Sequence, residues 1–100
     1  MNTQPNELPI PPSAAQDTRA IELVRVWVAQ GKQHVSMATG VWSDPASWGI
    51  FLVDLAKHVA NAYQQSTGGD RDTILQRIKA GFDAEWGHAT DSPKGSLLDK

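Results

Sequence analysis

Cysteine is absent from this 100-residue sequence, and charge is sparse, with nine Lys and Arg and eleven Asp and Glu. Without cysteine the chain can form no disulfide, no thiolate metal site and no cysteine nucleophile. The nine cations are scattered from Arg19 to Lys100 and form no run or stripe, so the electrostatic footprint of a phosphate-backbone binder is missing. We therefore expect no nucleic acid among its partners.

Long apolar runs and cofactor motifs are also missing. No stretch approaches the roughly eighteen apolar residues of a membrane helix, and the N-terminus lacks the basic start and apolar segment of a signal peptide. We therefore expect a cytoplasmic protein that does not bind membranes. There is no glycine-rich phosphate loop, and His34, His58 and His88 fall on different predicted elements, so neither a cofactor nor a metal is expected.

The composition that remains, with 40% hydrophobic residues and four tryptophans, is typical of a small globular domain. Four prolines in residues 1–13 predict an extended arm, residues 14–87 form a single α+β domain, and residues 88–100 read as a disordered tail. A folding unit of this size buries only about 60% of its unfolded surface. Self-association, which would bury more apolar area, is a reasonable expectation.

The next segment, residues 20–29, fits both a helix and a strand. The β-branched Val24, Val26 and Val28 favour a strand, and a two-residue turn at Gln30-Gly31 would then pair this segment with residues 33–37. In that register Val26 lies opposite Val35, which makes one face apolar. The other face is mixed and carries Arg25, Trp27, His34 and Ser36. We predict a hairpin, with a helix over residues 20–29 as the open alternative.

Two helix start signals follow the hairpin. Asp44-Pro45 predicts a helix that continues at apolar spacing until Gly68-Gly69, and Asp70 predicts a second helix that runs to Trp86-Gly87. A short glycine-containing connection indicates antiparallel neighbours. The expected fold is therefore α+β, with one β-hairpin packed against two antiparallel helices, a flexible N-terminal arm and a C-terminal tail.

Two groups of polar residues are candidate sites. The mixed hairpin face, with Arg25, Trp27, His34 and Ser36, offers recognition chemistry for an anion or a partner chain, unless Trp27 is simply covered by packing.

The second group, an acid/base edge, holds Asp54, His58 and Asn61. Asp54 and His58 are neighbours on a helix, where a carboxylate can orient an imidazole for acid/base work; the alternative is a solvated pair.

Trp42 and Trp48 bracket the first helix start. Packing of Trp42 on the first turn is the favoured interpretation, with a ligand-stacking pair as the alternative.

Several strings of residues, taken in order, resemble a family of short bacterial proteins, the domain-of-unknown-function family numbered five thousand and seventy-six. They include Glu7-Leu8-Pro9, Leu23-Val24-Arg25-Val26-Trp27, Gln33-His34-Val35-Ser36, Trp48-Gly49-Ile50 and Phe82-Asp83-Ala84-Glu85-Trp86. The resemblance covers nearly the whole chain and implies a stand-alone α+β domain of bacterial origin. It brings no activity, cofactor or partner, so no functional residue is carried over.

The leading functional hypothesis is a non-catalytic protein-interaction domain that self-associates through its hairpin edge or an uncovered apolar patch. The expected partner is a second copy, in a homodimer, or another protein. The alternative is a small-molecule (anion) binding protein or a minor enzyme with a pocket between hairpin and helix. That alternative would use Arg25 and His34 as anion contacts, or Asp54 and His58 as an acid/base pair. The sequence leaves open whether any reaction is catalysed.

Overall fold

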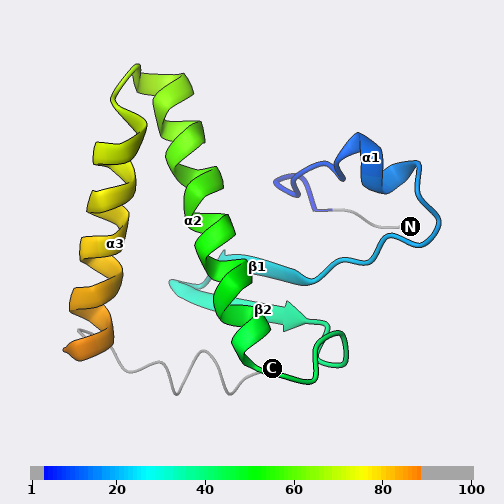
Figure 1. The fold of residues 1–100 in the computed structure, drawn as a ribbon. Coiled ribbons are helices and arrows are strands. Elements are labelled where there is room, and N and C mark those ends of the chain that lie inside the picture. The colour runs from blue at the N-terminus through cyan, green and yellow to red at the C-terminus, as the bar shows by residue number, and fades with distance from the viewer. Residues whose placement is uncertain (1–3, 89–100) are drawn as a thin grey trace.

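The computed structural model describes residues 4–88. The α+β prediction is confirmed, with an antiparallel hairpin followed by two long antiparallel helices (Figure 1). One element was not predicted, a single-turn helix at the end of the proline-containing arm. The predicted tail lies, after His88, outside the described residues. The elements are α1 (Pro12–Ala15), β1 (Val24–Ala29), β2 (Lys32–Met37), α2 (Ala46–Thr67) and α3 (Arg71–Gly87).

The turn between β1 and β2 sets the hairpin register. Gln30 and Gly31 both have positive φ, 56° and 74°, as the two central residues of a type I′ turn require. The strands pair from Val24 opposite Met37 to Ala29 opposite Lys32, which is the register predicted from the sequence. Residues 24–29 are therefore strand, and the helical alternative for this segment is wrong.

The start and end of α2 follow from its flanking residues. Asp44 Oδ1 accepts a hydrogen bond from the Ala46 amide at 3.0 Å, and Pro45 already has helical φ and ψ of −56° and −22°. Asp44 thus caps the helix and Pro45 occupies its first turn, where a missing N–H costs nothing. The helix ends at Gly68, whose φ of 77° favours glycine.

Asp70 caps α3. Its carboxylate accepts hydrogen bonds from the Thr73 amide at 2.9 Å and the Thr73 hydroxyl at 2.8 Å. The hydrogen bond from the Thr73 amide, followed by the one from its hydroxyl, lowers the pKa of Asp70 below its ordinary value of 3.8. Near the turn, Arg71 Nε donates to Asn61 Oδ1, which ties the start of α3 to α2. The two helices are therefore joined firmly at the end where the chain turns.

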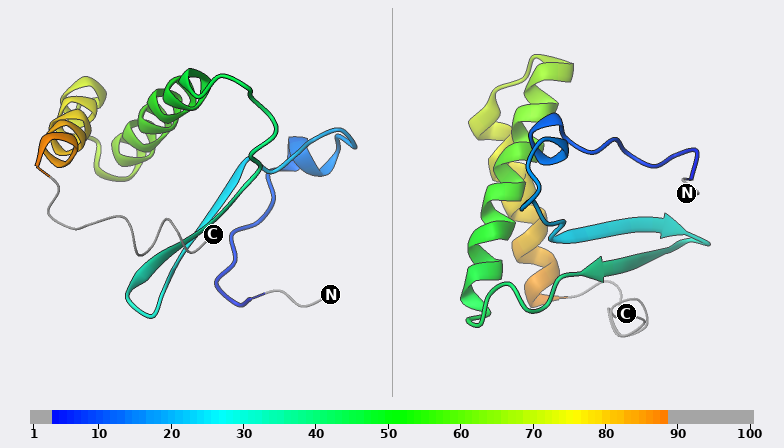
Figure 2. Two further views of the ribbon diagram at one scale, coloured as in Figure 1. Left: turned by 90° about the horizontal axis from the view of Figure 1, so that it is seen from below. Right: turned by 90° about the vertical axis from the view of Figure 1, so that its right-hand side faces the viewer.

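The hairpin does not pack against the helices of its own chain, which corrects one part of the predicted fold. Within the described residues, no Cα of either strand lies within 8 Å of a Cα in α2 or α3. Figure 2 shows the hairpin projecting away from the helix pair. Among residues 4–88, Ala60 alone is buried. The elements form as the local sequence dictates, but within residues 4–88 much of their apolar surface stays exposed.

An aromatic cluster fixes the connection between β2 and α2. Trp42, in the connection after β2, contacts Trp48 edge to face, with ring centroids 5.1 Å apart and planes at 81°. Trp48 contacts Phe51 in the same way at 5.6 Å and 90°. The connection is thereby held on the first turns of α2, as predicted for Trp42.

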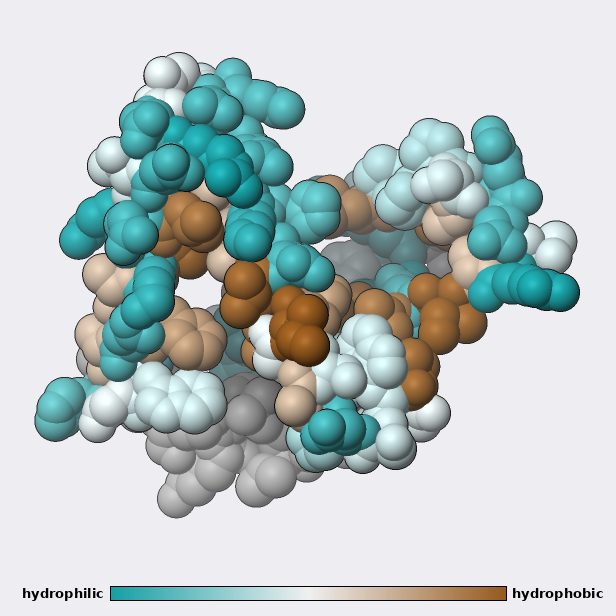
Figure 3. Space-filling model, viewed as in Figure 1, coloured by the Kyte–Doolittle hydropathy of each residue, from teal (hydrophilic) through white to brown (hydrophobic). Residues whose placement is uncertain are grey.

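The apolar surface left open is extensive. Figure 3 shows hydrophobic side chains exposed between the two long helices. In the described part of the chain, neither long helix combines the length and hydropathy needed to cross a membrane. Fifteen large apolar side chains of the described residues are at least 37% exposed: Leu8, Ile10, Ile21, Val26, Val28, Met37, Val41, Ile50, Leu52, Val53, Leu55, Val59, Tyr63, Phe82 and Trp86.

Candidate functional site

The predicted binding face of the hairpin is assembled as the register requires. Arg25 lies opposite Ser36, and Trp27 lies opposite His34. His34 Nε2 forms a hydrogen bond of 3.1 Å with the carbonyl oxygen of Ala29, so the imidazole is held by its own hairpin. The four residues share one face, and their proposed role in binding stays a prediction.

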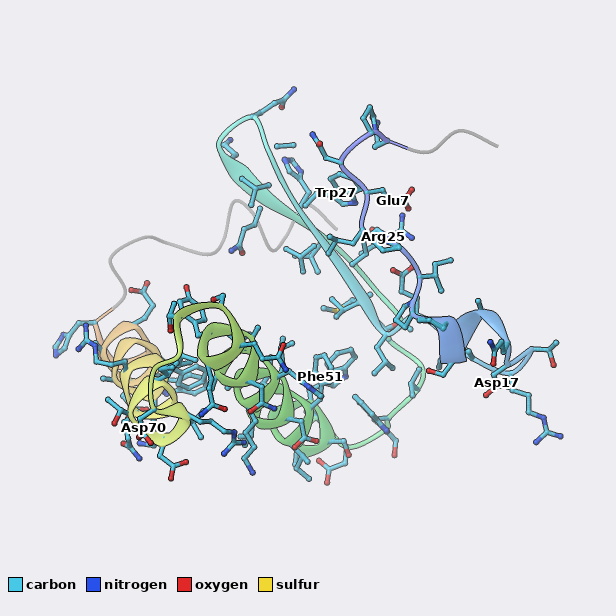
Figure 4. All side chains as sticks on the ribbon, turned by 90° about the horizontal axis from the view of Figure 1, so that it is seen from above. Glu7, Asp17, Arg25, Trp27, Phe51 and Asp70 are labelled. Atoms are coloured by element: carbon cyan, nitrogen blue, oxygen red, sulfur yellow. The ribbon has the colours of Figure 1, made fainter. Side chains whose placement is uncertain are left out.

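Arg25 is already engaged by two carboxylates. Its guanidinium nitrogens lie 2.9 Å from Glu7 Oε2 and 3.0 Å from Glu22 Oε1 (Figure 4). Glu22, through its hydrogen bond and its charge, raises the pKa of Arg25, and Glu7 acts in the same direction. Glu7 belongs to the N-terminal arm, so the ion pair holds the arm on the hairpin. Arg25 therefore has a structural role here, with its charge compensated.

The acid/base edge on α2 is less well assembled. Asp54 and His58 are both exposed, and in the described part of the chain no hydrogen bond joins them. Asn61 turns to α3 instead, where it accepts the bond from Arg71. Residues 4–88 contain no group of three His, Asp or Glu side chains able to hold a metal ion. The role of Asp54, His58 and Asn61 as an acid/base edge stays a prediction.

A groove between α2 and α3 was not anticipated from the sequence. It has a cavity volume of about 720 Å³ and opens where the helices diverge, away from the turn that joins them (Figure 1). Phe82 and Trp86 stack on its α3 side, with centroids 5.5 Å apart, and Trp86 is 81% exposed. Its apolar lining includes Trp48, Leu52, Val53, Ala56, Leu75, Ile78, Phe82 and Trp86.

A second cavity, of about 620 Å³, lies between the N-terminal arm and β1 rather than between the hairpin and a helix. Its lining includes Leu8 and Ile10 of the arm and Val24 and Val26 of β1. The Glu7–Arg25 ion pair lies beside this cavity and fixes the arm in place. This space is the seam between two segments of the chain, closed mainly by apolar side chains.

Helix α2 carries two neighbouring rows of residues spaced four apart. Trp48, Leu52 and Ala56 line the groove, and this row ends at the buried Ala60 against α3. The second row, which we call the α2 ridge, is Phe51, Leu55, Val59 and Tyr63. Leu55, Val59 and Tyr63 are 43%, 37% and 56% exposed.

Figure 4 shows Phe51 on the side of α2 that faces the hairpin across open space. The α2 ridge is therefore an apolar row in which Leu55, Val59 and Tyr63 are exposed, while Phe51 at its end is half-buried beside Trp42 and Trp48.

The sequence contains a signal for the α2 ridge, because the apolar positions of this helix cover a wide arc of its circumference. At about 100° per residue, the apolar positions of α2 from Phe51 round to Val53 span about 200° of the helix. A helix packed on one neighbour needs a stripe only slightly wider than about 100°. The sequence marked these residues as core without indicating what would cover them.

The comparisons with known proteins agree with this fold. A solved structure from the photosynthetic bacterium Rhodopseudomonas palustris, provisionally described as a pyruvate dehydrogenase, is 34% identical, with a TM-score of 0.69. The match covers 91% of this chain and 93% of that one. No curated protein matches. A family model matches residues 7–90, which confirms the resemblance seen in the sequence. The protein therefore belongs to the family described as a domain of unknown function, DUF5076.

Proposed function

We propose that this protein is a non-catalytic interaction domain whose folded form is a self-associated assembly. The observation that carries the proposal is the burial pattern. Among residues 4–88 one small side chain, that of Ala60, is buried, while fifteen large apolar side chains are substantially exposed. Hydrophobic burial is the dominant favourable contribution to folding, and a chain with so little of it needs further cover.

The exposed area supports the same conclusion. The chain exposes 8692 Å², whereas a compact monomer of 10.9 kDa exposes about 5,600 Å². The excess is about 3,000 Å². This excess is larger than the about 1,000 to 2,500 Å² that each subunit of an obligate homodimer buries. The open surface of one chain is therefore more than enough for an interface with a second chain.

The arrangement of the polar groups supports a non-catalytic role. Catalysis needs nucleophiles, bases and charge-stabilising donors that converge on one cavity. Asp54 and His58 line neither of the two cavities described above, and Arg25 is paired with Glu7 and Glu22. For these reasons we do not extend the enzyme description of the Rhodopseudomonas protein to this chain.

Static light scattering across a concentration series, with tryptophan emission recorded on the same samples, tests the proposal. We expect a mass of twice 10.9 kDa or a higher multiple, and the emission then reports whether Trp86, which is 81% exposed in one chain, is covered in the assembly. A mass of 10.9 kDa at every concentration, with the emission of exposed tryptophan, would refute it.

A further inference from the structure

We infer that the α2 ridge is the contact between two copies of this chain, each ridge packing against the other about a two-fold axis. This inference rests on the proposed function, since it names the surface through which the self-association occurs. The partner is a second copy of the same chain. The surface consists of Phe51, Leu55, Val59 and Tyr63.

The first step is that α3 cannot cover the whole apolar arc of α2. The apolar positions of α3, from Ile74 round to Trp86, span about 120°, which is the stripe of a helix with one neighbour. That stripe faces the groove row of α2, from Trp48 to Ala60. The remaining apolar arc of α2, which is centred on Leu55, therefore needs a different neighbour.

The second step is that the chain's own hairpin does not supply that neighbour. Within the described residues the strands stay beyond 8 Å, Cα to Cα, from both long helices. The aromatic contacts of Trp42 with Trp48 and Phe51 hold the connection on the first turns of α2. The space beside the α2 ridge is thus open to another molecule.

The third step is that the α2 ridge complements itself. A two-fold axis across the helix places the same patch on both copies in opposite directions. Because its residues are evenly spaced, the midpoint between Leu55 and Val59 is also the midpoint between Phe51 and Tyr63. Leu55 then faces Val59 of the second copy, and Phe51 faces its Tyr63. Rows spaced four apart interdigitate in this way at a crossing angle of about −50°.

The area argues for the same occupant. The excess exposed surface of about 3,000 Å² per chain is larger than the about 1,000 to 2,500 Å² that each subunit of an obligate homodimer buries, so it leaves room for an interface of that size. The α2 ridge itself carries no charged residue, which is typical of the centre of a homodimer interface. A second copy therefore satisfies both the extent and the chemistry of this surface.

The first test replaces Leu55 with Asp and uses Ile50→Asp as the matched control. Both residues are exposed apolar side chains of α2, but Ile50, at 67% exposed, lies on the polar side of the helix outside the ridge. We expect L55D to raise the dimer dissociation constant at least about 100-fold, because the charge would be buried twice across the two-fold axis. I50D should change that constant by less than about threefold. Circular dichroism reports whether each variant keeps its helices.

The second test does not depend on the folding of L55D. The chain has no native cysteine, so single-cysteine variants report proximity directly. When equal amounts of L55C and V59C chains are mixed and oxidised, we expect the mixed disulfide to exceed the roughly 1:2:1 proportion of random pairing, because those two positions face one another and a disulfide needs Cα atoms within about 7 Å. I50C mixed with V59C should give no mixed product beyond that random proportion.

The outcomes separate this inference from the proposed function. If wild-type protein associates but L55D leaves the assembly intact and the mixed disulfide is not favoured, the ridge pairing is overturned while self-association stands. If, in addition, a Val26→Asp variant no longer associates, the contact lies on the apolar hairpin face instead. A wild-type chain that stays monomeric overturns both.

Discussion

Thermal stability should depend on protein concentration if the folded body contains two chains. A monomer unfolds at a temperature independent of its concentration, whereas mass action stabilises an associated state as concentration rises. The perturbation is simply dilution. It requires no mutation and therefore cannot be confused with local damage to the fold.

The size of the effect follows from the number of ordered residues. Residues 4–88 are described in each chain, about 170 in two chains. At about 0.7 kcal/mol per residue, the unfolding enthalpy of the dimer is about 120 kcal/mol near 60 °C. For a two-state dimer that unfolds to two separate chains, this enthalpy gives a rise in Tm of about 4 °C for each tenfold increase in concentration.

Circular dichroism at 222 nm from about 2 to about 200 µM measures this shift, with an expected rise of about 8 °C across the series. A second series at the same concentrations with I50D serves as a control, because that variant should show the same slope. A Tm that stays within about 1 °C from end to end would refute the reasoning.

Other predictions concern single elements of the fold. Gln30→Asn should stabilise the hairpin by up to about 1 kcal/mol in denaturant unfolding, because Asn adopts the left-handed conformation more readily. Trp42→Ala should cost about 1 to 3 kcal/mol by losing its ring contacts with Trp48 and Phe51, measured in the same way. Asp70→Ala should lower Tm above pH 4, and the difference from wild type should shrink as the pH falls through the depressed pKa of Asp70, below 3.8. An Asp70→Ala deficit that persists at the lowest pH would contradict the capping account.

Local structure was predictable from the sequence because short-range rules determine it. The Gln30-Gly31 turn fixes strand pairing through its backbone angles, and every register pair then follows from the two-residue period. The helix starts at Asp44 and Asp70 were readable for the same reason, since capping is a contact over two or three residues. These interactions form within one segment.

Packing between elements was not predictable in the same way. An apolar face in the sequence indicates that a side chain needs cover, but not which element provides it, and so the hairpin was predicted to pack against the two helices, which it does not do. The Glu7–Arg25 ion pair joins residues 18 apart and has no local signal. Asp54 and His58 have helical neighbour spacing, but exposed side chains gain too little to be held together.

The most direct test is an isotope-filtered NOE experiment on an equal mixture of labelled and unlabelled chains, which detects only contacts between molecules. The account predicts intermolecular NOEs from the methyl groups of Leu55 on one chain to those of Val59 on the other. It also predicts NOEs between the rings of Phe51 and Tyr63 across the same interface. A filtered spectrum without cross-peaks from these four residues, recorded on a sample that light scattering shows to be associated, would contradict it.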